Sequence, residues 1–257
     1  MSIFSLSFLG MFAAAGGIVS MTTAFERGDR DEASRQGAQA GPVVIEEALT
    51  SPVRVTRLAA ITSAPAVEAR TELLAALASA AGTGDRRTAI PAARAARSIA
   101  RELAQAAADG ELPDDLDPED LATWRSLFDS LAGNPGRFVE VRVLALDTAS
   151  SLAHVAQPGD IGFDLSAALA DNDPAVRAIA VQLVPRPTPA SAHAPLAGVV
   201  IHEADTKLAL AAAQVLCGDD RGAAVGALGA QGLDRIKQLV AGKPPRSTRD
   251  ARRCLER

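Results

Sequence analysis

The chain has very few aromatic side chains. Its 257 residues include no tyrosine, one tryptophan and seven phenylalanines, so aromatics make up only 3%. Hydrophobic residues nevertheless reach 48%, and alanine is the commonest of them. Sheets are built from β-branched and aromatic residues with a two-residue alternation, and no convincing alternation is present. The composition therefore argues against a β-sandwich or barrel and favours closely packed helices in a chain long enough for a sizeable core.

The chain also lacks a positive charge excess. The net charge is −5 and the sequence pI is about 5.3. A protein that follows a nucleic-acid backbone needs a basic stripe. We therefore expect no nucleic-acid partner.

Residues suited to catalysis or metal binding are sparse. The three histidines are His154, His193 and His202, and none shows the spacing of a zinc-binding helix. The sequence contains no nucleophile elbow and no phosphate-binding loop motif. The glycine-rich segment 222–232 follows no strand, so we interpret it as a site of close helix packing with a turn near its end. The acidic segment 109–120 contains Pro113 and Pro118, which favours a solvated loop over a calcium loop, with Asp117-Pro118 starting the next helix. We expect no metal, no cofactor and no enzymatic activity.

The most informative segment is DNDPAVRAIAVQLVP, residues 171–185. Asp171–Asp173 can cap a helix that begins at Pro174, and Pro185 ends it. Arg177 lies four residues after Asp173, a spacing that allows an ion pair. One apolar stripe follows the helical period: Val176, Ile179, Ala180 and Leu183. We expect Ile179 and Leu183 to be buried.

Similar stripes recur along the chain. They begin at residues 55, 92, 141, 176 and 208, and separations of roughly 30–50 residues are typical of helical-pair repeats. The other four stripes are Val55-Leu58-Ala59-Thr62, Ala92-Ala95-Ala96-Ile99 extended by Leu103, Val141-Leu144-Ala145-Thr148 and Leu208-Ala211-Ala212-Val215.

DNDPAVRAIA, at the start of the segment 171–185, resembles the second-helix signature of HEAT repeats, with Asp, Pro, Val-Arg and then a small residue. SPVRVTRLAA, residues 51–60, is a weaker copy that is one residue out of register. The resemblance implies an all-α fold: a short right-handed α-solenoid of stacked antiparallel helical pairs, preceded by an apolar segment. It implies a protein-binding surface and no catalytic residue.

An uncharged run, residues 3–25, opens the chain. Three interpretations stay open. Thr22-Thr23-Ala24 could be the small-residue cleavage site of a signal peptide. Alternatively, residues 3–25 could form an uncleaved membrane anchor or a helix buried in the protein. We therefore divide the chain into a signal peptide or anchor (1–24), a polar linker (25–41) and a HEAT-like helical domain (42–257).

Two further features concern location and binding. Cys217 and Cys254 are the only cysteines, and in an exported protein they are candidates for one disulfide. Arg94, Arg97 and Arg101 share one helical face opposite the alanine stripe, which makes them candidates for docking an acidic partner.

Three function classes follow. The preferred one is a non-catalytic protein–protein interaction scaffold of the cell envelope, exported to the periplasm or envelope, with a protein or peptide partner. The alternative is a structural subunit of an envelope complex, anchored in the membrane by residues 3–25. A HEAT-like enzyme such as a lyase is disfavoured, because the chain has few aromatics and an acidic balance.

Overall fold

The computed structural model describes the backbone of residues 4–113, 116–156 and 164–256, and side chains from Ala14 onward. Every regular element within these ranges is a helix, and no strand occurs among them. Among the helices with described side chains, none is long and apolar enough to cross a membrane. The chain forms two compact units, residues 1–158 and 159–257, so the single repeat domain expected at 42–257 is divided near Pro158.

The first unit contains eight α-helices and two short 3₁₀ helices within its described residues. Their bounds are α1 (Phe4–Glu26), α2 (Arg30–Ala40), α3 (Pro42–Leu49), α4 (Arg54–Ser63), η1 (Ala64–Ala66), η2 (Arg70–Leu73), α5 (Leu74–Thr83), α6 (Arg86–Asp109), α7 (Pro118–Gly133) and α8 (Val139–Ala156).

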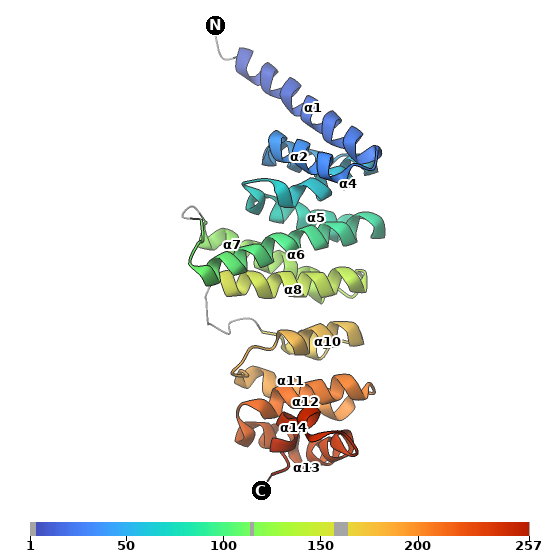
Figure 1. Ribbon diagram of the computed structural model, residues 1–257, viewed down its shortest axis with the longest axis vertical. Helices are drawn as coiled ribbons and strands as arrows, with labels where there is room; N and C mark the ends of the chain where they lie inside the picture. The colour runs from blue at the N-terminus through green and yellow to red at the C-terminus, as the bar shows by residue number, and fades with distance from the viewer. Residues whose placement is uncertain (1–3, 114–115, 157–163, 257) are drawn as a thin grey trace. The chain divides into compact units, whose positions relative to one another are not determined.

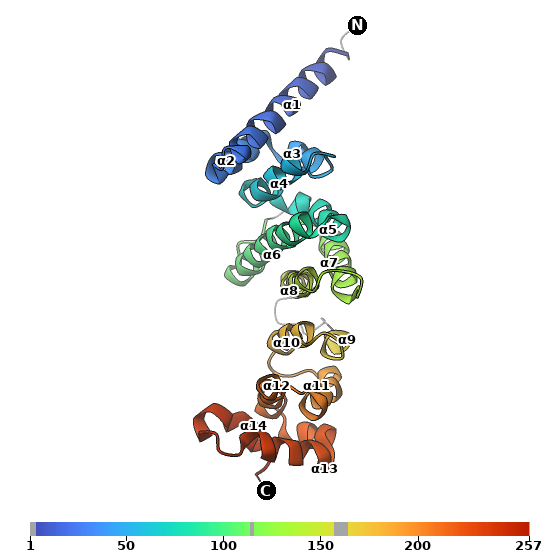
Figure 2. The ribbon, with the colours of Figure 1, turned by 90° about the vertical axis from the view of Figure 1, so that its right-hand side faces the viewer.

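Helices of the first unit pack as consecutive pairs in two layers. The pairs are α3 with α4, α5 with α6 and α7 with α8. Helix α5 also contacts α3 and α7, while α6 contacts α4 and α8. Figures 1 and 2 show the two layers, and in Figure 2 α4, α6 and α8 line one side of this unit. Each pair therefore buries its apolar surface against the next pair in the chain.

The predicted stripes hold in α6 and α8. All five predicted residues of α6, from Ala92 to Leu103, are buried, as are all four in α8. In α4 the buried set is instead Thr56, Ala59, Ala60, Ile61 and Ser63, while Val55 and Leu58 are partly exposed. Contacts with α2, α3 and α6 enclose α4 from several directions, which explains why one stripe does not describe its buried surface.

The expected polar linker at 25–41 is largely helical. Helix α2 covers Arg30–Ala40, is capped by Asp29 and contacts α1 and α4. It approaches α4 through small residues: a Cβ built on Gly37 would lie 2.2 Å from the Cβ of Ser63. Ser63 Oγ donates to Ala33 O at 2.8 Å. Because small residues make this contact, it leaves no large apolar stripe for a sequence pattern to detect.

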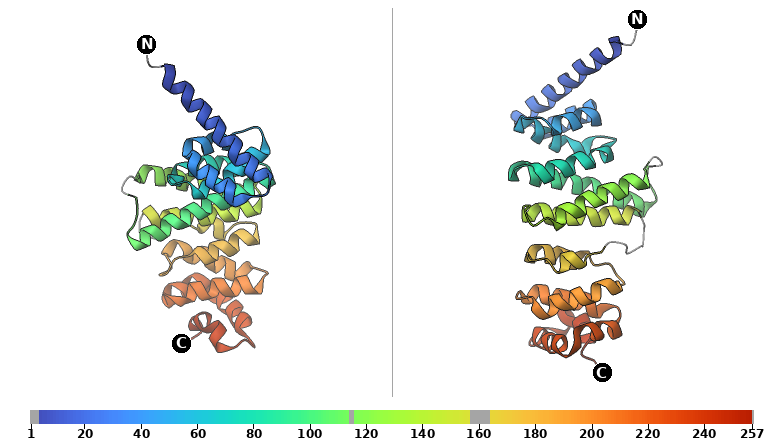
Figure 3. Two further views of the ribbon diagram at one scale, coloured as in Figure 1. Left: turned by 45° about the horizontal axis from the view of Figure 1, so that its top comes forward. Right: turned by 180° about the vertical axis from the view of Figure 1, so that it is seen from behind.

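The second unit contains α9 (Ser166–Leu169), α10 (Pro174–Leu183), α11 (Ala190–His202), α12 (Thr206–Gly218), α13 (Arg221–Val240), η3 (Pro245–Thr248) and α14 (Arg249–Arg253). It repeats the pattern of the first unit. Consecutive helices α9 and α10, α11 and α12, and α13 and α14 are in contact. Helix α11 also contacts α9 and α13, and α12 also contacts α10 and α14 (Figure 3).

Helix α10 begins where the sequence predicts. Asp173 is its N-cap, Pro174 is its first residue, and Asp173 Oδ1 accepts from the Ala175 amide at 2.8 Å. The buried residues are Val176, Ala180 and Val181. The expected burial of Ile179 and Leu183 is wrong, because both side chains are only partly buried. Within its unit α10 contacts α9 and α12, and the buried face is rotated from the predicted stripe toward Val181.

A bend interrupts α13 where the glycine-rich segment predicts a turn. Gly229 has φ 56° and ψ −168° inside the helix. Side chains rarely adopt this positive φ, so glycine is the residue suited to the bend. The bend joins two helical stretches of α13.

Candidate functional site

The three arginines predicted for docking lie on the exposed face of α6. Asp85 starts this helix, and its Oδ1 accepts from the Thr88 amide at 2.9 Å. Arg94 and Arg101 are exposed and Arg97 is partly exposed, whereas the alanine stripe opposite is buried. We refer to Arg94, Arg97 and Arg101 as the arginine face.

A carboxylate from the neighbouring helix organises two of these arginines. Asp147, on α8, is only 5% exposed. Its Oδ2 lies 2.8 Å from Arg97 Nε and 2.7 Å from Arg101 Nη2. One carboxylate charge thus faces two guanidinium charges. Asp147 fixes the arginine side chains and leaves a net positive charge at the surface.

Arg94 completes the arginine face. Among the described residues it has no hydrogen-bond or ion-pair partner, and it lies near enough to Glu140 for its charge to act there. The pKa of Glu140 is lowered by a backbone hydrogen bond, by Arg86 and more weakly by Arg94. An open depression of about 400 Å³ is lined by Arg94, Arg97, Ser98, Arg101, Glu102 and Gln105.

The arginine face suits carboxylates better than other groups. A guanidinium is permanently charged, and its planar N–H donors match the two oxygens of a carboxylate. The acidic side chain that lines the depression, Glu102, already pairs with Arg70 at 3.0 Å. The N–H donors of Arg94 thus stay available to a ligand, while Asp147 on α8 holds Arg97 and Arg101 in place.

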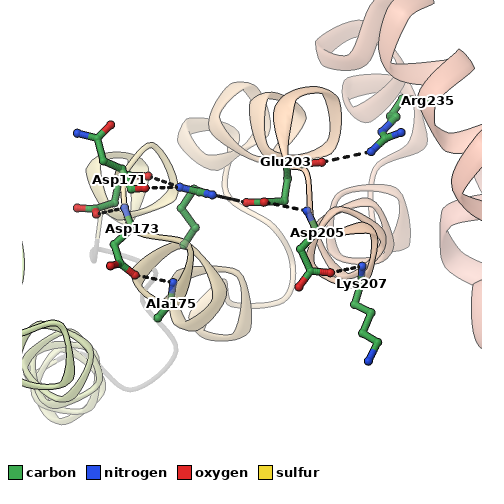
Figure 4. A network of polar contacts seen from close by, with 9 residues as sticks. Asp171, Asp173, Ala175, Glu203, Asp205, Lys207 and Arg235 are labelled. Atoms are coloured by element: carbon green, nitrogen blue, oxygen red, sulfur yellow. Dashed lines mark hydrogen bonds and ion pairs between the residues drawn. The ribbon is translucent and has the colours of Figure 1, made fainter.

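A second polar cluster joins helices of the second unit (Figure 4). Arg177, on α10, donates to Glu203 Oε2 through Nε at 2.8 Å and Nη2 at 2.5 Å. Its Nη1 donates to the backbone oxygens of Asp171 and Asn172 at 2.7 and 3.0 Å. The expected pair of Arg177 with Asp173 is replaced by these bonds, because Asp173 is engaged in capping the helix.

Glu203 connects three segments through its carboxylate and carbonyl. Oε1 accepts from the Asp205 amide at 3.0 Å, just before α12, and the backbone oxygen accepts from Arg235 on α13 at 3.2 Å. Burial opposes ionisation of Glu203, but the Asp205 amide and Arg177 outweigh it, so the pKa lies below its ordinary value. The carboxylate is therefore ionised at neutral pH and stabilises the second unit.

A cavity of about 390 Å³ adjoins this ion pair. It is lined by Leu169, Ala170, Asp171, Arg177, Pro195, Gly198, Val199, His202 and Glu203. The Arg177 donors are already bonded to protein oxygens. This leaves the cavity few free polar groups with which to hold a specific ligand, so the arginine face is the stronger candidate.

Other residues singled out in the sequence do not form a chemical site. Within the part of the chain that the structure describes, no group of three or more His, Cys, Asp or Glu side chains could hold a metal. His154 Nδ1 lies 2.8 Å from Ser150 O, and His202 is exposed. In the acidic segment Asp117 caps α7 as predicted, while Asp114 and Asp115 lie outside the described residues.

The two cysteines are brought together. A disulfide links Cys217, near the end of α12, to Cys254, which follows α14, with a Cα–Cα distance of 5.6 Å. Both side chains are buried. The bond fastens the last helix of the chain to α12.

No protein-family model matches this chain, and a search of curated proteins found no match. Sequence reasoning found the arginines but missed Asp147 and Glu203. Each is a single acidic residue within a helical segment or at its end, and only the packing of helices reveals its partner.

Proposed function

We propose that this protein is a non-catalytic scaffold of the cell envelope that binds a protein partner through the arginine face. The observation that carries the proposal is the arrangement of Arg97 and Arg101 on one buried carboxylate, with Arg94 unpaired among the described residues. Ordering of arginine side chains before binding reduces the entropy lost on binding. The partner is a protein segment rich in aspartate or glutamate.

The proposed architecture in each unit is a short right-handed α-solenoid of HEAT-like pairs. Supporting it, each helix of a pair contacts its counterpart in the next pair, both in α3–α8 and in α9–α14. Arrays of this kind present the outer face of one helical layer as an extended binding surface. Helix α6 lies in the middle of such a layer in the first unit.

Export to an oxidising compartment is part of the proposal. The disulfide between Cys217 and Cys254 supports it, because disulfides persist in secreted and periplasmic proteins and are rare in the cytosol. A structural subunit anchored in the membrane is the second candidate. The packing of α1 onto the first unit supports retention of this helix, which an anchor requires.

A charge reversal on the arginine face tests the docking proposal. The probe is a fluorescent peptide of glutamate and glycine, and the variant is Arg94→Glu, which breaks no hydrogen bond or ion pair within the described residues. We expect binding to the wild type that weakens as salt rises, and a loss of roughly tenfold in the variant. The control is Arg30→Glu, which makes the same charge change at an exposed position on α2.

The geometry of the face provides a second comparison. Arg97→Lys with Arg101→Lys keeps the charge but removes the planar donors. If these lysines bind the peptide as well as the arginines do, the attraction is non-specific. Equal binding by Arg94→Glu and Arg30→Glu would contradict the proposed site.

Crosslinking in the native cell identifies the partner. A photo-crosslinking residue at Ser98, inside the depression, is compared with one at Asn134, an exposed position after α7. We expect a protein that is captured only from Ser98 and carries an acidic segment. Capture of the same proteins from both positions would contradict docking at the arginine face.

A further inference from the structure

Half of α1 belongs to the core of the first unit. Met21 is 0% exposed and Ala24 is buried. A Cβ built on Gly17 would lie 2.9 Å from the Cβ of Ala40 on α2, so the two helices approach closely there. Contacts of α1 with α2, α3 and α4 cover part of this half of the helix, while Val19 remains 64% exposed. Removal of α1 would leave these buried surfaces open to water.

The connection from α1 to α2 also depends on residues before the predicted cleavage site. The amide of Arg27 donates to Thr23 O at 3.2 Å, and the amide of Asp29 donates to Ala24 O at 3.1 Å. Asp29 in turn caps α2. Cleavage after Ala24 would remove both acceptors and the buried Met21. These contacts favour a helix that stays on the mature protein.

The other half of α1 extends beyond α2, α3 and α4 (Figures 1 and 2). The transition lies at Gly16, where a built Cβ would have no atom within 4 Å, and Ala15 is exposed. The sequence of this free half, from Phe4 to Gly16, contains no charged residue. It includes Phe4, Leu6, Phe8, Leu9 and Phe12.

We infer that α1 is retained and that its free half inserts into a lipid bilayer, which holds the first unit at a membrane surface. Apolar residues are spread around the whole helix rather than along one side. A helix that docks on a protein while its back faces water needs a polar face, whereas a helix that is apolar all round suits hydrocarbon. This distribution favours lipid over a second copy of the chain.

Its length indicates how deep the helix reaches. The stretch from Phe4 to Gly16 covers about 20 Å at 1.5 Å per residue, and the hydrocarbon core of a bilayer is about 30 Å thick. The free half alone is therefore too short to cross the hydrocarbon core, although it is longer than one leaflet of about 15 Å. The charged residues between the end of α1 and the start of α2, from Glu26 to Glu32, remain in water.

Two measurements on the full chain test the inference. Mass spectrometry of the protein from its native cell should find peptides that contain residues 14–24, and a mature N-terminus after Ala24 would overturn retention. In flotation, the wild type should rise with vesicles of phosphatidylcholine and phosphatidylglycerol. The double variant Leu6→Arg with Leu9→Arg should bind the vesicles at least roughly tenfold more weakly, because placing arginine in hydrocarbon costs free energy.

Controls separate membrane insertion from folding and self-association. The double variant should keep the wild-type melting temperature, because the substitutions lie outside the packed half of α1. Arg30→Glu should float like the wild type. If the wild-type protein sediments as a dimer and does not float, the free half of α1 packs against a second copy of the chain, and the inference of lipid insertion is wrong. Peptide binding at the arginine face is scored separately, so failure of one proposal leaves the other intact.

Discussion

Arg177 and Glu203 are separated by 26 residues in the sequence, yet they form an ion pair whose side chains are only 20% and 4% exposed. The pair joins the beginning of α10 to the end of α11. Glu203 also accepts from the amide of Asp205, which caps α12. One carboxylate therefore connects three helices of the second unit.

Glu203→Gln should destabilise the second unit. The substitution removes the negative charge and leaves the largely buried guanidinium of Arg177 without its ionic partner. We expect a loss of about 2–3 kcal/mol in the free energy of unfolding, since Arg177 keeps its two backbone acceptors. Urea unfolding measures the change. Lys237→Ala breaks an exposed pair with Asp234 and should cost less than about 0.5 kcal/mol; equal losses would contradict a special role for Glu203.

The stabilisation from Glu203 should depend on pH. Its pKa is lowered in the folded protein from the ordinary 4.5, so the folded state favours the ionised form. The stabilisation is full above the unfolded pKa and is lost as pH falls through the folded pKa. The stability difference between wild type and Glu203→Gln should be constant from about pH 7 to about pH 5.5 and shrink below about pH 4.5. A constant difference throughout would exclude ionisation as its origin.

A methyl group at position 37 should weaken the contact between α2 and α4. Alanine normally stabilises a helix by about 1 kcal/mol relative to glycine. At Gly37 the added Cβ would meet the buried Ser63 side chain at 2.2 Å, and the overlap should reverse the sign to a net loss of about 1–3 kcal/mol. Gly226→Ala is the control, because a Cβ there meets nothing within 4 Å. Stabilisation by both substitutions would show that α2 is not packed on α4.

The face of α10 can be tested by introducing charge. Val176 is buried, whereas Ile179 is partly exposed. Val176→Asp should therefore cost several kcal/mol, about the cost of burying an unpaired carboxylate. Ile179→Asp should cost clearly less, since water can solvate part of the new charge. Thermal melts of the two variants show which loses more stability. A larger loss for Ile179→Asp would support the buried stripe that the sequence predicts.

Loss of the disulfide should loosen the end of the chain. The bond between Cys217 and Cys254 closes a loop of 37 residues, and a loop of this size contributes about 3–4 kcal/mol in the chain-entropy model. Cys254→Ser should lower the stability of the second unit by about that amount. Mass spectrometry of alkylated, non-reduced protein from the native cell provides the check. Two free thiols would contradict both the bond and the export proposal that it supports.

The sequence predicts local features of this protein well. Caps such as Asp117 and Asp173 act within a few residues, so their sequence signals suffice to place the starts of α7 and α10. The predicted stripes of α6 and α8 are also buried, although α8 buries more than its stripe, including the unbroken run 144–150. In both cases the interaction that fixes the structure is visible in a short window.

Features that depend on a distant partner are not predicted. Gly37 is a poor helix former by itself, and only its contact with Ser63 explains its place in α2. Asp147 lies among apolar residues of α8, and its function follows from two arginines on α6. Long-range pairing of this kind requires the relative positions of helices, which no short sequence pattern contains.

The pairing of neighbouring helices in the first unit has a consequence for biosynthesis. Contacts between α3–α4 and α5–α6, and then between α5–α6 and α7–α8, join segments that leave the ribosome one after another. Chains with mainly local contacts fold fast, and nascent proteins fold from their N-terminal part onward. Each new pair can therefore settle on one already formed, and an unfolded nascent chain exposes its apolar stripes only briefly to other proteins.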